Sequence, residues 1–233
     1  MKWQVDLHGD KDDLEDLSKI FTSSDLQIIR EGDGYILESS SFERCKDFNV
    51  VKEIADKLLD AINATKQITL DSSDILIRGA IQYKDEGGNR SIFLETTISV
   101  KSSVRARLTV RKADGTIEES VSGKQMIKWI PLIESDDRVR RAFDLMNHDF
   151  KSWNGFYKII EVVQEDNFPP VLRKGEFYDD IDLLKQTAQS YEAVKTEARH
   201  AHEKFKKPDK DMKINEAKSL TKRIVEMWLN SKI

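Results

Sequence analysis

Hydrophobic and polar residues alternate with a period of two in the opening part of the chain. The alternation covers residues 3–7, and shorter apolar runs lie at 26–29 and 35–37. Between the last two runs stands Gly32-Asp33-Gly34, which favours a tight turn because glycine tolerates a positive φ. We therefore predict a strand followed by a β-hairpin, with one face of each buried.

Two segments near these strands have apolar residues at helical spacing. The first, residues 14–21, follows Asp10 and Asp12, and either side chain is suited to cap a helix N-terminus. The second begins near Asp47 and runs to about residue 62. The opening of the chain is thus predicted to be β-α-β-β-α.

A strand-rich region follows the second predicted helix. Residues 75–84 and 91–100 are joined through Glu86-Gly87-Gly88-Asn89, which is another hairpin signal. Residues 104–111 alternate in polarity, and Asp114-Gly115 turns that segment into the next one. This pattern predicts an antiparallel β-meander with one buried and one solvated face.

The hydrophobic period changes from two to that of a helix after Gly123. Phe168-Pro169-Pro170 interrupts this part, because proline lacks the backbone N–H and clashes inside a helix. The predicted helices are one with apolar residues at 139–146 and a cap at Ser135, then 153–163, 176–189, 191–205 and 213–229. The pattern predicts an α+β protein, with an α+β domain at 1–123 and an all-helical bundle at 124–233.

Three large aromatic residues stand on the predicted apolar faces of the helical part. They are Trp153, Tyr157 and Trp228. Rings of this size bury a large apolar area and dominate the energetics of a core. We therefore expect the three to pack together inside the bundle rather than to form a platform for a ligand.

The composition is that of a highly charged globular protein, since 39% of the 233 residues are hydrophobic and 34% are charged. No apolar run is long enough to span a bilayer, and the N-terminus has no apolar signal-peptide core. The single Cys45 cannot form a disulfide within the chain, which favours the cytoplasm. Acidic residues are concentrated in the first 60 positions, so the remainder is mildly basic and is compatible with contact to nucleic acid.

The strongest chemical signal lies in Glu197-Ala198-Arg199-His200-Ala201-His202. If this segment is helical, Arg199 and His202 share a face. A fixed cation beside a group that titrates near neutrality suits phosphodiester cleavage, with histidine as acid or base and arginine stabilising charge on phosphorus. Arg199, His200 and His202 are therefore the candidate catalytic residues. The alternative is a solvated helix on which Arg199 pairs with Glu197 or Glu203.

A row of cations falls on one face of the alternating segment in the predicted meander. Its members are Lys101, Arg105, Arg107 and Arg111. Such a row can follow a phosphate backbone, so these are candidate nucleic-acid-binding residues. No aromatic side chain is interleaved for base stacking, and a solvated sheet face explains the row equally well.

Metal binding has weaker support in the sequence. His8 with Asp10, Asp12 and Asp13 is acidic enough to attract a cation, but it lacks the glycine and closing glutamate of a calcium loop. A capping aspartate explains this segment without a metal. His200 and His202 lie two residues apart, which is poor helical spacing for two ligands. We therefore expect no metal and no cofactor.

The chain resembles a family of uncharacterised bacterial proteins. In the back half, the resemblance rests on Trp153, Tyr157-Lys158, Glu161, Thr187-Ala188, Glu197-Ala198-Arg199-His200, Pro208, Met212, Glu216-Ala217 and Trp228-Leu229. In the front half, the Trp3 strand and the hairpin between Asp25 and Glu38 carry it.

More distantly, the helical half resembles HEPN domains, which are helical bundles of bacterial toxins and phage-defence ribonucleases. Their motif is an arginine, a polar residue and a later histidine. Arg199-His200 matches its opening, whereas residues 203–206 hold no histidine. The resemblance implies an RNA-directed nuclease of defence or stress, with its site formed in one chain or across a homodimer. We expect its cleavage to need no metal, because the sequence offers no credible set of metal ligands. The alternative is a non-enzymatic interaction module that binds a protein or nucleic-acid partner.

Overall fold

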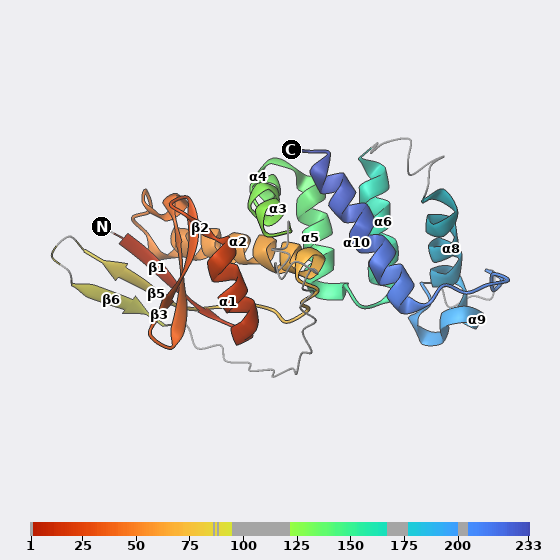
Figure 1. The fold of residues 1–233 in the computed structure, drawn as a ribbon, viewed down its shortest axis with the longest axis horizontal. Helices are drawn as coiled ribbons and strands as arrows, with labels where there is room; N and C mark the ends of the chain where they lie inside the picture. Colours follow the sequence, from red (N-terminus) through yellow and green to blue (C-terminus); the bar gives the residue numbers. More distant parts are fainter. Residues whose placement is uncertain (1, 86, 88, 95–121, 167–176, 200–204) are drawn as a thin grey trace, which may run out of the picture. The chain divides into compact units, whose positions relative to one another are not determined.

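The computed structural model describes residues 2–85, 87, 89–94, 122–166, 177–199 and 205–233. Contacts between Cα atoms divide the chain into two compact units, Met1–Ile130 and Pro131–Ile233. The first unit contains an antiparallel sheet with helices, and the second is helical (Figure 1). The chain is therefore an α+β protein, as its hydrophobic periods predict. Within the described ranges, no helix is both long and apolar enough to cross a membrane.

Strands of the first unit pair in the order β2-β3-β4-β1-β5-β6, and every pairing is antiparallel. They are β1 Lys2–His8, β2 Thr22–Ser23, β3 Leu26–Glu31, β4 Gly34–Ser39, β5 Ile77–Lys84 and β6 Arg90–Phe93. The predicted hairpin is confirmed, because Glu31 pairs with Gly34 and Gly32 has a φ of 62°. The two-residue β2 was not predicted, since it is too short to show alternation.

The described part of the first unit also contains helices, two of which pack on one face of this sheet. The helical elements are α1 Lys11–Ile20, η1 Ser40–Phe42, α2 Phe48–Thr69 and α3 Ser122–Trp129. Tyr35 and Arg78 both lie opposite Leu7 in the sheet, so they point to the same side as Leu7. On that side, the Tyr35 hydroxyl donates to Glu15 of α1 at 2.8 Å, and Arg78 pairs with Asp56 of α2 at 2.8 Å. Both long helices therefore pack on the Trp3–Leu7 face, which is buried.

Aspartates begin both of these helices, as the sequence predicts. The Asp10 carboxylate accepts from the backbone N–H groups of Asp12 and Asp13 at the start of α1. The Asp47 carboxylate accepts from the N–H of Asn49 at 2.6 Å at the start of α2. Each cap satisfies backbone donors that have no partner inside the first turn.

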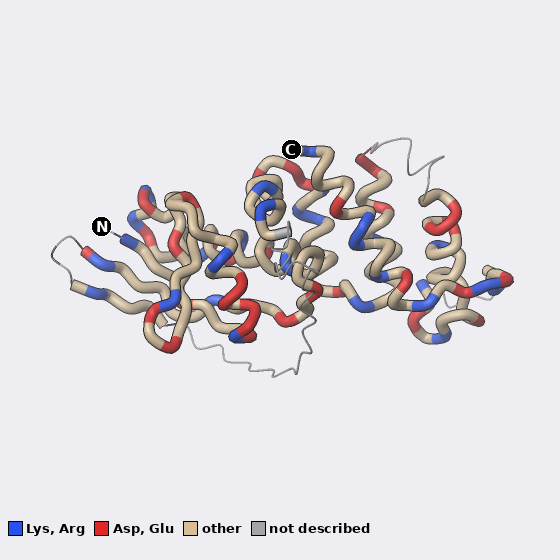
Figure 2. The backbone as a smooth tube through the Cα atoms, viewed as in Figure 1, with Lys and Arg blue, Asp and Glu red and all other residues tan. Residues whose placement is uncertain are grey.

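A buried ion pair joins α1 to α2. The Lys66 ammonium lies 2.6 Å from the Asp13 carboxylate, and neither side chain is more than 1% exposed. Lys66 also donates to the backbone carbonyl of Asp74, and the Ser72 hydroxyl donates to Asp13. Acidic positions gather along α1 (Figure 2), but Asp13 is the one of them that turns into the core. The network therefore fastens both helices to the segment that leads into β5.

Several predicted elements lie outside the described residues. These are the continuation of the last strand over 95–100, the meander over 104–121 and the break at Phe168-Pro169-Pro170. The hairpin that joins β5 to β6 is present, with Lys84 paired to Arg90. Its two strands were expected from residues 75 and 91, so both starts agree to within about two residues.

The second unit consists of helices around a central α6. Its elements are α4 Leu132–Ser135, α5 Asp137–Asp149, α6 Trp153–Glu165, α8 Tyr178–Gln189, α9 Tyr191–Val194, η2 Lys195–Glu197 and α10 Ile214–Asn230. α6 packs against α5, α8 and α10. The predicted cap at Ser135 is wrong, because Ser135 ends α4. The carboxylate of Asp136 instead accepts from the N–H groups of Arg138 and Val139.

A close backbone approach sets the packing of α5 against α6. A Cβ atom added to Gly155 would lie 1.8 Å from the backbone oxygen of Asp149, which no side chain can tolerate. Ser152 caps α6 by accepting from the N–H of Gly155 at 3.0 Å. Glycine at this position therefore lets the two helices form a tight antiparallel pair.

The three aromatic residues of the bundle are buried, but they do not form one cluster. Trp153, Tyr157 and Trp228 are 6%, 6% and 0% exposed. The Trp228 indole N–H donates to Asp166 at 2.8 Å, at the C-terminal end of α6. Trp153 begins the same helix, so about 20 Å of helix separates it from Asp166. The expectation that Trp153 packs on Trp228 is therefore wrong.

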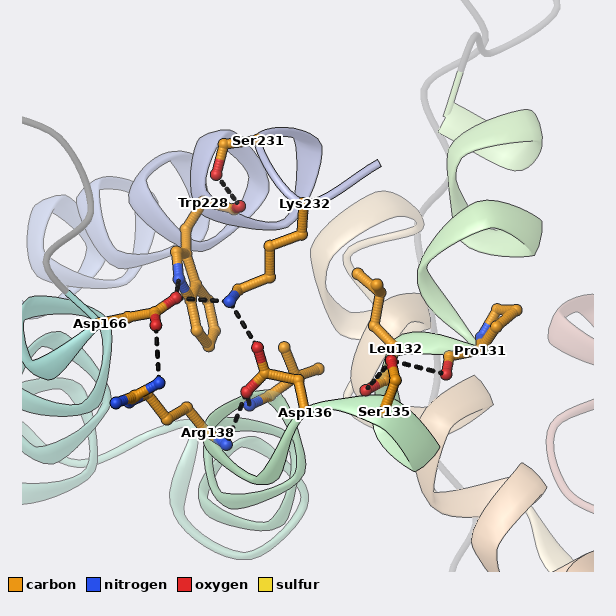
Figure 3. Close-up of polar contacts among 10 residues, drawn as sticks. Pro131, Leu132, Ser135, Asp136, Arg138, Asp166, Trp228, Ser231 and Lys232 are labelled. Carbon is orange, nitrogen blue, oxygen red and sulfur yellow. Dashed lines mark hydrogen bonds and ion pairs between the residues drawn. The ribbon is translucent and has the colours of Figure 1, made fainter.

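A charged network at the end of the chain joins three segments of the second unit (Figure 3). Lys232 donates to Asp136 at 2.6 Å and to Asp166, while Arg138 pairs with Asp166 at 2.9 Å. Burial raises the pKa of both carboxyls, but hydrogen bonds and nearby positive charge outweigh it, so both pKa values end below the usual value. Lys232 acts on both carboxyls, the backbone N–H groups of α5 act on Asp136, and Trp228 and Arg138 act on Asp166. Burial likewise lowers the pKa of Lys232, yet its two carboxylate partners raise the pKa overall. The network fastens the C-terminus to the start of α5 and the end of α6.

Replacement of Lys232 by methionine is expected to lower the free energy of unfolding at pH 7 by about 2 kcal/mol. The variant leaves two carboxylates close together without their shared cation. Because the pKa values of Asp136 and Asp166 are lowered by folding, their contribution is present above pH about 4 and is lost as the pH falls through the lowered values. The Lys232 contribution is present below pH about 10 and is lost as the pH rises through its raised pKa.

Urea unfolding of both proteins at pH 7 and pH 3 measures this difference. The exposed Lys210→Met is the matched control and should change little at either pH. A loss in Lys232→Met that is equally large at pH 3 would contradict the electrostatic origin of the effect.

Candidate functional site

The predicted catalytic segment is not a helix over its described part. α9 ends at Val194, Lys195 has a φ of 55°, and a 3-10 turn follows to Glu197. Arg199 lies just beyond this turn, and its backbone N–H donates to the carbonyl of Ala188 at 2.9 Å. The predicted helix over 191–205 is confirmed at Tyr191–Val194, but residues 195–199 do not continue it as an α-helix. Arg199 is therefore not on a helix, and His202 lies outside the described residues. The chain turns here because Lys195 combines a φ of 55° with a ψ of −128°, which is not a helical conformation.

The side chain of Arg199 is held by two residues of α6. Its guanidinium lies 3.1 Å from the carboxylate of Glu161 and 4.2 Å from the centre of the Tyr157 ring. Tyr157 and Glu161 are four residues apart, so they lie on one face of the helix. The Arg199 side chain is 30% exposed. The described ion pair of Arg199 is with Glu161, which no sequence-local argument identifies, whereas Glu203 lies outside the described residues.

A second cation approaches the same ring from α8. The Lys185 ammonium lies 5.4 Å from the centre of the Tyr157 ring and donates to the side-chain oxygen of Gln164 at 2.5 Å. Burial lowers the pKa of Lys185. The carboxylate of Glu161 raises the pKa of Lys185, and the positive charge of Arg199 lowers it further. The pKa of Lys185 is therefore below its usual value. Two cations and one carboxylate thus meet around Tyr157, whose hydroxyl accepts from Gln189 at 2.8 Å. We call Tyr157, Glu161, Lys185 and Arg199 the Arg199 cluster.

A shallow hollow of about 370 Å³, open to solvent and lined mostly by exposed side chains, lies between α5 and α6 next to this cluster. Leu145 and Val162 supply its apolar lining, and Asp144 and Lys158 lie along it. Glu161 lines the hollow as well as pairing with Arg199. This double role follows from helix geometry. The stripe of α6 that faces α5 consists of residues 158, 161, 162 and 165. The stripe that faces α8 consists of residues 157, 161 and 164.

Arg141 and Glu165 span one end of the hollow with an ion pair of 2.6 Å. Neither Asp144 nor Lys158 has an ion pair to another described residue. Figure 2 shows acidic and basic positions interspersed along the helices of this unit. The hollow therefore offers one anion and one cation that are not paired with other described residues, together with an apolar surface.

The structure leaves most predicted site residues untested. His200 and His202 lie outside the described residues, and so do Lys101, Arg105, Arg107 and Arg111. Arg199 is described, and it meets three residues that the sequence did not identify as members of a site. The sequence predicts Tyr157 to be a core residue and offers Glu161 only as part of a resemblance, so helical spacing alone identifies neither as a site residue. Lys185 carried no signal in the sequence, because its partners come from other helices.

The described residues contain no group of three His, Cys, Asp or Glu side chains that could hold a metal ion. In the segment once considered for a cation, Asp10 caps α1 and Asp13 binds Lys66. Comparison with models of known protein families, with curated proteins and with solved structures gave no match.

Proposed function

We propose that the protein acts on RNA and that its second unit binds the phosphate backbone at the Arg199 cluster. The observation that carries this proposal is the meeting of Arg199 and Lys185 at the ring of Tyr157. Burial lowers the pKa of Lys185, and repulsion from Arg199 lowers it further, so both effects disfavour the charged form of the lysine. A phosphate group relieves both penalties, because it neutralises the pair and accepts hydrogen bonds from both side chains.

The same groups are suited to cleave RNA without a metal ion. The ribose 2′-oxygen attacks phosphorus while its proton passes to Glu161, and Arg199 stabilises the charge that develops on the phosphoryl oxygens. The bond from phosphorus to the 5′-oxygen breaks as Lys185, made more acidic by its lowered pKa, donates a proton to the leaving oxygen. The products are a 2′,3′-cyclic phosphate and a 5′-hydroxyl. His200 and His202 stay predicted alternatives for these proton transfers. A cytoplasmic location is part of this proposal.

A second candidate function is RNA binding without cleavage. The ion pair of 3.1 Å between Arg199 and Glu161 favours this function. The guanidinium and the carboxylate already bind each other, so neither is free for a catalytic role. Cleavage requires that an entering phosphate displaces Glu161 from the guanidinium and leaves the carboxylate near the 2′-hydroxyl. In a binding module, the pair would instead hold Arg199 in a fixed orientation for contact with the backbone.

Arg199→Ala is expected to reduce RNA cleavage by a factor of about 100 to 1,000, as the loss of a charge-stabilising donor does in other enzymes. A single-stranded RNA oligonucleotide is incubated with protein and chelator, and the products are separated on a gel. Cleavage should persist with chelator and be absent for the matching DNA, which lacks the 2′-hydroxyl. Its rate should be highest near neutral pH.

Two variants serve as controls for this experiment. Lys206→Ala removes an exposed cation from the same connection between α8 and α10 and should leave the rate unchanged. Glu161→Gln should abolish cleavage while binding of the oligonucleotide persists. Binding that needs Arg199, without cleavage by the wild type, would favour the binding module. Absence of both binding and cleavage would reject an action on RNA.

A further inference from the structure

We propose that the hollow between α5 and α6 is a base subsite selective for guanine. This inference rests on the proposed function, since it assigns the hollow to the nucleotide whose phosphate lies at the Arg199 cluster. Glu161 belongs to both places. A base in the hollow and a phosphate at Arg199 are therefore neighbours, as they are within one nucleotide.

The size and lining of the hollow suit a single base. Its volume of about 370 Å³ is at the lower end of the range for small-molecule sites, about 300–1,000 Å³. It runs along the eight residues from Lys158 to Glu165, a length of about 10 Å. Leu145 and Val162 offer an apolar surface on which the flat face of a base can pack. The ion pair between Arg141 and Glu165 bounds the far end.

The charges along the hollow match guanine better than the other bases. Guanine presents two adjacent donors, N1–H and the 2-amino group, beside the acceptor O6. A carboxylate accepts both donors at once, and an ammonium donates to the acceptor. Asp144 and Lys158 supply an exposed carboxylate and an exposed ammonium along the hollow, and neither has an ion pair to another described residue. Adenine and cytosine place an acceptor where the carboxylate needs a donor, and uracil offers only one donor.

The charge balance of the hollow also favours a base over a phosphate as its occupant. Its two cations, Arg141 and Lys158, are outnumbered by Asp144, Glu161 and Glu165. Phosphate contacts need a positive surface, which is present at Lys185 and Arg199 instead. The base therefore binds in the hollow, and the phosphate of the same nucleotide binds at Lys185 and Arg199.

Binding of the four ribonucleoside 3′-monophosphates to the full chain, followed by calorimetry, tests this assignment. The guanosine nucleotide should bind roughly tenfold more tightly than the adenosine nucleotide, the difference that a bidentate base contact produces. Asp144→Asn should remove most of this preference and leave the adenosine affinity unchanged. Asp137→Asn is the matched control, because it alters an exposed carboxylate on the same helix and should preserve the preference.

The outcomes separate the two proposals. Equal affinity for all four nucleotides, lost in Arg199→Ala, would overturn the guanine subsite and leave phosphate binding at the cluster intact. A guanine preference that survives both Asp144→Asn and Lys158→Met would overturn the hollow as its location. Absence of binding by every nucleotide would overturn both the proposed action on RNA and the subsite that rests on it.

Discussion

Replacement of Asp13 by alanine is expected to lower the free energy of unfolding of the first unit by about 3–5 kcal/mol. The variant leaves the Lys66 ammonium, which is 0% exposed, without the carboxylate that lies 2.6 Å away. It also removes the acceptor of the Ser72 hydroxyl. An uncompensated charge in a core costs far more than the pair itself contributes, which is why removal of one partner is the severe change. Urea unfolding followed by circular dichroism measures the loss.

Two further variants separate this effect from a general sensitivity of α1. Asp12→Ala removes a neighbouring carboxylate that is exposed, and it should cost less than about 1 kcal/mol. The double variant Asp13→Leu with Lys66→Met replaces the pair by apolar side chains and should recover much of the stability. If the double variant were as unstable as Asp13→Ala alone, packing rather than charge would be the cause.

Trp228→Ala should lower the free energy of unfolding of the second unit by about 3–5 kcal/mol, as truncation of a buried aromatic side chain does. The Trp228 side chain is fully buried near the end of α10. The variant leaves a cavity and also removes the donor to Asp166 and the ring beneath Lys232, 4.9 Å from its centre. Chemical unfolding followed by circular dichroism at 222 nm reports this change, because the second unit is helical.

Trp228→Phe distinguishes the two contributions of this residue. Phenylalanine keeps most of the apolar volume but cannot donate to Asp166, so its loss should be well below that of alanine. An alanine variant as stable as the wild type would show that the end of α10 contributes little to the bundle. Equal losses in the two variants would instead assign the whole effect to the hydrogen bond.

The Arg199 cluster shows how far a local pattern can identify a site. The sequence identified Arg199 as a functional candidate because a fixed cation stands beside two histidines. It did not reveal Glu161 or Lys185, which lie on other helices. Their approach to Arg199 depends on how α6 and α8 pack and on the turn at Lys195, and periodicity carries no information on either. The residues that surround a charge are therefore a property of the packing.

The sequence by itself determined the elements that a repeating pattern encodes. Alternation at residues 3–7, the glycines of the hairpin and the caps at Asp10 and Asp47 all act within a few residues, so they are readable without the fold. Tertiary structure decided what depends on partners far along the chain. It buried Lys66 against Asp13, joined α3 to the first unit and separated Trp153 from Trp228. Local propensity sets which helix or strand forms, whereas burial and charge pairing between distant segments set which side chains meet.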